Sequence, residues 1–202
     1  MMLRLDHLAV TCATLAEGVA QVEAALGLPM VAGGKHAAMG THNRLMRLGD
    51  LYLEVIAPDP DAPAPDRPRW FDLDHARGPA RLTHWVAACD DLDAALALAP
   101  GGAGTATELS RGDLRWRMGI PATGRLPFDG AFPALIQWHG TPPAVTLPDT
   151  GARLMRLVVT HPEAGALCRA LAGLSDPRLM IEVGPMSLRA QIDTAHGQRE
   201  LA

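Results

Sequence analysis

The chain has 202 residues, a formal net charge of −4 and a hydrophobic share of 48%. These values fit one globular domain, or two small ones. Only 4% of the residues are aromatic and no run of Lys and Arg occurs, which argues against a nucleic-acid-binding protein. Three scattered cysteines, no signal-peptide pattern and no apolar stretch of about 18 residues lead us to expect a cytoplasmic protein without disulfides or membrane spans.

The first part of the chain reads as a strand, a helix and further strands. A short β-prone run at 5–11 comes first, and Leu15, Val19 and Val22 then recur at helical spacing until Gly27. A weakly patterned strand is expected around 31–40. Two clearer strands follow in RLMRLG and YLEVI, so the predicted order is βαβββ.

This pattern recurs further along the chain. LDHLAVTCATL (5–15) and LTHWVAACDDL (82–92) align without a gap, which places His7 over His84 and Cys12 over Cys89. RLMRLG then resembles LRWRMG, and YLEVI (52–56) resembles LIQWH (135–139). The last alignment pairs Glu54 with Gln137. We therefore predict two diverged βαβββ modules.

The predicted fold class is α+β, in a single domain over 1–202. Its modules cover 3–60 and 81–142, and a connector at 57–69 holds five prolines, which cannot donate to a sheet. A short helix is expected after the connector. The tail, 152–200, reads as a partial third βαββ unit that packs against the paired modules or a partner chain.

Four residues form the candidate metal site. Side chains alternate along a strand, so the repeat should bring His7, Glu54, His84 and Gln137 to equivalent positions in one pocket. Imidazole nitrogen and carboxylate oxygen suit Zn, Ni, Mn or Fe(II), and such an ion would act as a Lewis acid. The competing interpretation is a hydrogen-bonded polar pocket without a divalent metal ion.

A second cluster lies in the loop GGKHAAMGTHN (33–43). His36, Thr41 and Asn43 are candidates for a substrate pocket, because glycine permits close approach and the polar groups can bind a ligand. The competing interpretation is a turn with Asn43 as a local cap. Trp138 is a candidate for the pocket wall, with core packing as its alternative.

The sequence resembles a known superfamily at these motifs. The DHLAV opening, the glutamate of YLEVI, and GGKH…GTHNRLMRLGDLYLEVIAPDP with a later FPALIQW resemble the vicinal oxygen chelate superfamily. Within it they look most like the glyoxalase-like domain family often numbered third. The resemblance implies paired βαβββ modules around a cavity, with ligands from the first and last strands. Those positions are His7, Glu54, His84 and Gln137.

The sequence departs from the family pattern at its last position. Metal-bearing relatives place a carboxylate there as ligand and base, whereas Gln137 is neutral and cannot abstract a proton. Glu54 is therefore a candidate ligand or base, and His139 and His36 are alternative catalytic bases.

Three functions remain open. One is a metal-dependent lyase, isomerase or dioxygenase that acts on a small oxygenated molecule. Another is a metal-free protein that binds or sequesters such a molecule, and a third is a dimerisation module. The expected partner is a small molecule rather than nucleic acid or a membrane, and a homodimer is compatible with the pattern.

Overall fold

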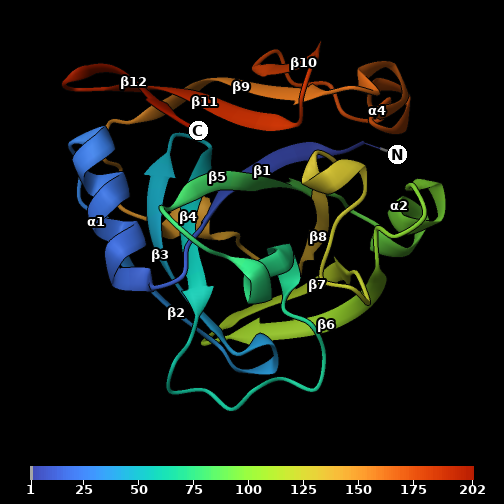
Figure 1. The fold of residues 1–202 in the computed structure, drawn as a ribbon, viewed down its shortest axis with the longest axis horizontal. Helices are drawn as coiled ribbons and strands as arrows, with labels where there is room; N and C mark the ends of the chain where they lie inside the picture. Colours follow the sequence, from blue (N-terminus) through green and yellow to red (C-terminus); the bar gives the residue numbers. More distant parts are fainter. Residues whose placement is uncertain (1) are drawn as a thin grey trace.

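The computed structural model describes residues 2–202. An eight-stranded sheet and a four-stranded sheet form two stacked layers, with helices at the sides (Figure 1). The strands of the large sheet are β1 (Arg4–Thr11), β2 (Val31–His36), β3 (Thr41–Leu48), β4 (Leu51–Pro58), β5 (Arg81–Ala88), β6 (Thr105–Arg111), β7 (Leu114–Ile120) and β8 (Ala134–Trp138). The helices are α1 (Leu15–Leu26), α2 (Leu92–Leu98), α3 (Pro143–Thr146) and α4 (Ala164–Ala170).

The large sheet consists of two copies of one βαβββ module. Its strand order is β2-β3-β4-β1-β5-β8-β7-β6, so the first strands of the modules, β1 and β5, pair antiparallel at the centre. The outermost strands β2 and β6 also contact each other, so the sheet curls into a nearly closed barrel (Figure 1). The predicted paired-module α+β fold is confirmed.

The helices pack on the outer face of the curled sheet. Val22 and Leu26 of α1 are buried there, and the helix ends at Gly27, whose φ of 70° suits glycine. In the second module the side chain of Asp91 accepts a hydrogen bond from the Ala94 amide at 3.0 Å and so caps α2. Gly27 therefore ends α1, and Asp91 begins α2, through local backbone geometry and hydrogen bonding.

The tail forms its own sheet over the outer face of the barrel. Strands β9 (Arg153–His161), β10 (Leu179–Val183), β11 (Ser187–Thr194) and β12 (Gly197–Leu201) pair in the order β10-β9-β11-β12. Leu157 and Ala190 share one hydrophobic core with Leu8 and Val10 of β1. The tail thus packs against the paired modules, and β12 adds a strand that the predicted βαββ unit lacks.

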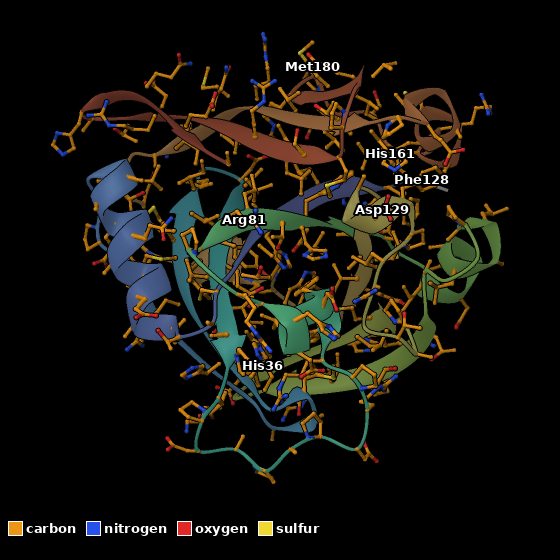
Figure 2. All side chains as sticks on the ribbon, viewed as in Figure 1. His36, Arg81, Phe128, Asp129, His161 and Met180 are labelled. Atoms are coloured by element: carbon orange, nitrogen blue, oxygen red, sulfur yellow. The ribbon has the colours of Figure 1, made fainter. Side chains whose placement is uncertain are left out.

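Three apolar side chains of the tail sheet are exposed. Met155 is 51% exposed, Met180 38% and Val183 81%. Figure 2 shows Met180 on the outer side of this sheet. The homodimer stays a prediction.

The connector brings one short helix to the barrel. Ala57 and Pro58 still belong to β4, so the strand-free connector is 59–69 rather than the predicted 57–69. A 3-10 helix, η2 (Trp70–His75), follows. Trp70 and Phe71 of η2 are buried against Ile56 and Ile136 on the concave face of the sheet. Within residues 2–202, no helix has both the length and the apolar character needed to cross a membrane.

Candidate active site

A pocket lies on the concave face of the barrel, beneath η2. The centre of a water-sized molecule can move through about 30 Å³ of it. Figure 2 shows one of its residues, His36, near the end where β2 meets β6. Its walls are polar on the first module and largely aromatic elsewhere, and they comprise His7, His36, Asn43, Tyr52, Glu54, Trp70, Phe71, Arg111, Trp116, Met118, Ile136 and Trp138.

A β-bulge sets the orientation of His7. The register of β1 against β5 shifts between Leu5 and His7, so Asp6 has no partner in the ladder. Asp6 Oδ1 therefore lies 2.6 Å from His7 Nδ1, and Asp6 Oδ2 accepts a hydrogen bond from Trp138 Nε1 at 2.9 Å. A carboxylate only accepts hydrogen bonds, so His7 Nδ1 carries the proton in this contact. Both residues are buried.

The other edge of the His7 ring faces Glu54. His7 Nε2 lies 3.7 Å from Glu54 Oε2, which is too long for a hydrogen bond. The imidazole stacks on the Tyr52 ring, with centroids 4.3 Å apart and planes at 15°. Burial raises the pKa of Tyr52 well above its usual value, so the phenol stays neutral.

Glu54 is held by a chain of polar side chains. Asn43 Nδ2 donates to Glu54 Oε1, and Asn43 Oδ1 accepts from Arg111 Nη1 at 2.7 Å. His36 lies 3.4 Å from the same Arg111 nitrogen, and its Nδ1 is 3.1 Å from Thr41 Oγ1. Burial, followed by the charge of Arg111, lowers the pKa of His36 to about 3, so this imidazole is neutral.

The two glycines of β2 make room for this chain. A Cβ atom on Gly33 would lie 2.0 Å from Asn43 Oδ1 and 2.6 Å from the Asn43 carbonyl oxygen. A Cβ atom on Gly34 would lie 2.7 Å from Cδ of Arg111. The Gly34 amide also donates to Asn43 Oδ1 at 2.8 Å. The GGKH motif thus admits Asn43 and Arg111 to the pocket, rather than forming a free loop.

Aromatic rings close the remaining sides. The Trp116 and Trp138 rings pack with centroids 5.5 Å apart, and Trp70 stacks on Phe71 at 5.7 Å. Trp138 therefore lines the pocket and belongs to the packed core at the same time. The Trp70 indole Nε1 is buried and has no hydrogen-bond partner among the described residues.

Gln137 does not face this pocket, and the predicted pairing with Glu54 is corrected. Cys12 N donates to Ile56 O, and Cys89 N donates to Ile136 O, so the matched cysteines make Ile56 and Ile136 equivalent. Glu54 then corresponds to Ala134, three residues before Gln137. An odd shift places a strand side chain on the opposite face. Gln137 instead accepts from Leu92 N at 3.1 Å and donates to Asp90 O at 2.9 Å, at the start of α2.

His84 occupies a separate cleft, so it also fails to join His7 and Glu54. Its ring packs against Phe71, with centroids 5.0 Å apart, and Phe71 lines both cavities and helps to separate them. The cleft beside His84 has a volume of about 810 Å³. Burial lowers the pKa of His84 to about 4, so it is neutral near pH 7.

His139, the alternative base, lies outside the pocket. Its side chain is 43% exposed, and its Nε2 is 3.4 Å from Glu108 Oε2. The structure therefore gathers His7, Glu54, His36, Thr41, Asn43 and Trp138, and leaves out His84, Gln137 and His139.

The donor set does not fit the expected metal site. Of the four predicted ligands, only His7 and Glu54 come together, and His36 Nε2 faces the Arg111 guanidinium. Within residues 2–202, no group of three or more His, Cys, Asp or Glu side chains is close enough to hold a metal ion. Two ligands are fewer than the three that protein metal sites with open positions use.

Several residues of the pocket escape sequence reasoning. Asp6 precedes a candidate histidine, but only the bulge turns it toward the His7 ring. Arg111 lies 68 residues from Asn43 and reaches it only because β2 and β6 meet. Trp70 and Phe71 come from the short helix after the connector, and no motif marks them as pocket residues.

Comparisons with known proteins agree with this architecture. A family model described as a glyoxalase-like domain matches residues 5–175. A hypothetical protein from Staphylococcus aureus has a similar structure, with a TM-score of 0.61 and 12% identity over 92% of this chain and 88% of that one. No curated protein matches the sequence.

Two further structures from Streptomyces coelicolor are more distant. A methylmalonyl-CoA epimerase variant in complex with 2-nitronate-propionyl-CoA has a TM-score of 0.47 and 18% identity, over 69% of this chain and 100% of that one. A variant of 4-hydroxymandelate synthase has a TM-score of 0.45 and 16% identity, over 98% of this chain and 61% of that one. The family match covers most of the sequence and the two-module fold accords with it. The chain belongs to the glyoxalase-like domain family.

Proposed function

We propose that the pocket binds a small oxygenated molecule and that His7, together with Glu54, moves a proton on it. The observation that carries this proposal is the position of His7 between two carboxylates. Its Nδ1 is 2.6 Å from Asp6 Oδ1, whereas its Nε2 is 3.7 Å from Glu54 Oε2 and makes no hydrogen bond to it.

This arrangement leaves one basic nitrogen available. Asp6 accepts a hydrogen bond from Nδ1–H, so the other ring nitrogen, Nε2, carries the lone pair at the wall of the pocket. Stacking on Tyr52 holds the plane of the ring. Histidine is the side chain most often used for general acid–base catalysis. His7 is therefore the proposed base, and Asp6 is a positioning residue.

Glu54 is the second group that can carry a proton. Asn43 occupies its Oε1 atom, whereas Oε2 faces His7. A ligand with a C–H bond next to a carbonyl would lose that proton to His7 Nε2, and the bonding electrons would form the C=C bond of an enolate. Return of a proton to another position, from His7 or a protonated Glu54, would complete an isomerase-type reaction.

The pocket limits the size of the ligand. The centre of a water-sized molecule has about 30 Å³ in which to move, so the pocket accommodates a small molecule. The walls combine aromatic side chains with the polar groups of the first module and Arg111, and polar groups in such a site fix the orientation of a small molecule. We therefore propose a substrate of only a few heavy atoms.

Deuterium exchange tests the proposal. We would incubate the protein in D₂O with small carbonyl compounds (pyruvate, pyruvamide, hydroxyacetone and methylglyoxal) and follow their C–H protons by NMR. We expect faster exchange for at least one compound, and a rate about 10²-fold lower in His7→Asn. His196→Asn is the control, because His196 is an exposed residue of the tail. Equal rates for His7→Asn and wild type would contradict the proposal.

The alternative function is binding without a reaction, which the aromatic walls favour. It predicts a ligand that stabilises the fold by about 2.7 kcal/mol at a hundredfold excess over its dissociation constant. It also predicts that His7→Ala largely keeps this stabilisation and that no C–H exchange occurs. Metal analysis of the same preparations belongs with this test, since stoichiometric metal lost with His7→Ala would favour the metal-dependent function.

A further inference from the structure

Arg111 enters the pocket with one edge of its guanidinium group unused. Both polar contacts of the guanidinium group are made by Nη1. This atom lies 2.7 Å from Asn43 Oδ1 and 3.4 Å from His36 Nε2. Within residues 2–202, neither Nε nor Nη2 has a hydrogen-bond partner, and neither is among the buried unpaired atoms. These two atoms form the fork that binds a carboxylate through two parallel hydrogen bonds.

No carboxylate of the described residues neutralises this arginine. Other arginines of the chain, such as Arg117 and Arg178, form ion pairs with aspartates, but none is found for Arg111 within 4.0 Å in residues 2–202. Glu54 is its nearest acidic neighbour along the chain of hydrogen bonds, and the Asn43 amide stands between them. Asp6 is engaged by His7 and Trp138. The charge of Arg111 is thus not matched by a direct partner.

We propose that the ligand of this pocket is a small carboxylate, bound by Arg111 through Nε and Nη2. This inference rests on the proposed function, because it names the class of substrate on which His7 acts. The unused groups are donors only, so they require acceptor oxygens, and a planar carboxylate matches the guanidinium fork. The carbonyl carbon next to the carboxylate would then lie toward His7 and Glu54, which makes small 2-oxo acids the proposed substrates.

An isosteric pair of ligands tests the carboxylate directly. Pyruvate and pyruvamide have nearly the same shape, but pyruvamide lacks the negative charge. We would measure binding by calorimetry and C–H exchange in D₂O for both. We expect the wild-type protein to bind pyruvate between about 10-fold and 100-fold more tightly than pyruvamide. Equal affinity for the two compounds would overturn the inference.

Variants of Arg111 test whether this residue causes the preference for pyruvate over pyruvamide. Arg111→Gln and Arg111→Lys should each remove the preference for pyruvate, since neither offers the two-pronged donor. Arg115→Gln is the matched control, because Arg115 is exposed and donates only to main-chain oxygens of Gly112 and Leu114. A preference that survives both Arg111 variants would overturn the inference, even if one variant folds poorly.

The two proposals fail in different ways. Tight pyruvate binding that depends on Arg111, without C–H exchange, would leave the inference intact and refute the proton transfer. Exchange that depends on His7 but proceeds equally with pyruvamide would support the proton transfer and refute the carboxylate. Absence of pyruvate binding would count against the inference alone.

Discussion

His7 Nδ1 lies 2.6 Å from Oδ1 of Asp6, although the two residues are consecutive in one strand. Neighbours in a regular strand point to opposite faces. Here the shift in register between Leu5 and His7 leaves Asp6 out of the ladder, so its carboxylate can turn toward the imidazole. The bulge therefore creates the polar pair on which the proposed chemistry depends.

Asp6→Asn should lower C–H exchange by about 10²-fold while ligand binding changes little. Asparagine can present its amide nitrogen to His7 Nδ1, which would move the imidazole proton to Nε2 and remove the base. Loss of binding to the same extent as loss of exchange would show that Asp6 shapes the pocket rather than orienting His7. The pH profile of exchange in the variant is a further readout, because a purely structural change would leave its shape unaltered.

Asn43→Ala should destabilise the protein by about 1–3 kcal/mol. The substitution removes the donor to Glu54 and the acceptor for Arg111 and the Gly34 amide, so buried polar groups lose their partners. Urea unfolding measures the change. Gln198→Ala, at an exposed position of β12, is the control and should shift stability by less than about 0.5 kcal/mol. Equal effects of the two substitutions would contradict the polar network.

Gly33→Ala should destabilise the fold by about 1–3 kcal/mol, because its Cβ would lie 2.6 Å from the Asn43 carbonyl oxygen and displace backbone. Gly101→Ala is the matched control, since its Cβ would meet nothing within 4 Å. Thermal unfolding of both variants gives the comparison. Similar melting temperatures would mean that β2 does not pack against Asn43 as described.

Because of His84, the free energy of unfolding should decrease as the pH is lowered. Its pKa is lowered to about 4 in the folded protein, against about 6.5 in the unfolded chain, so the unfolded chain binds more protons between these values. The free energy of unfolding should therefore decrease from pH 6.5 down to pH 4, by up to about 1.4 kcal/mol per pH unit from this residue. Urea titrations at several pH values in wild type and His84→Asn isolate the contribution. Identical slopes would show that His84 is not buried as a neutral group.

The sequence contained enough information for the fold and for half of the pocket. The match of Cys12 with Cys89 and of His7 with His84 identified the repeat, because both cysteines make the same contacts at the ends of β1 and β5. His36, Thr41 and Asn43 were found because the glycines mark a place where the backbone must admit side chains closely.

The remaining residues could not be predicted, for physical reasons. The strand with Gln137 was aligned to Glu54 by residue type, and an error of three positions exchanged the two faces of β8. Separation of His84 from His7 depends on Phe71, which comes from the short helix η2 between the two modules. Phe71 also has a φ of 57°, a conformation that no pattern in the sequence predicts. Arg111 joins the pocket only through closure of the barrel.

The most direct test of the account is the protonation of the His7 ring. Long-range proton–nitrogen NMR of the histidine side chains distinguishes the two neutral tautomers. We predict that neutral His7 carries its proton on Nδ1, bound to Asp6, and that Asp6→Asn shifts the proton to Nε2. A neutral His7 with its proton on Nε2 in the wild-type protein would contradict the account, because no basic nitrogen would then face the pocket.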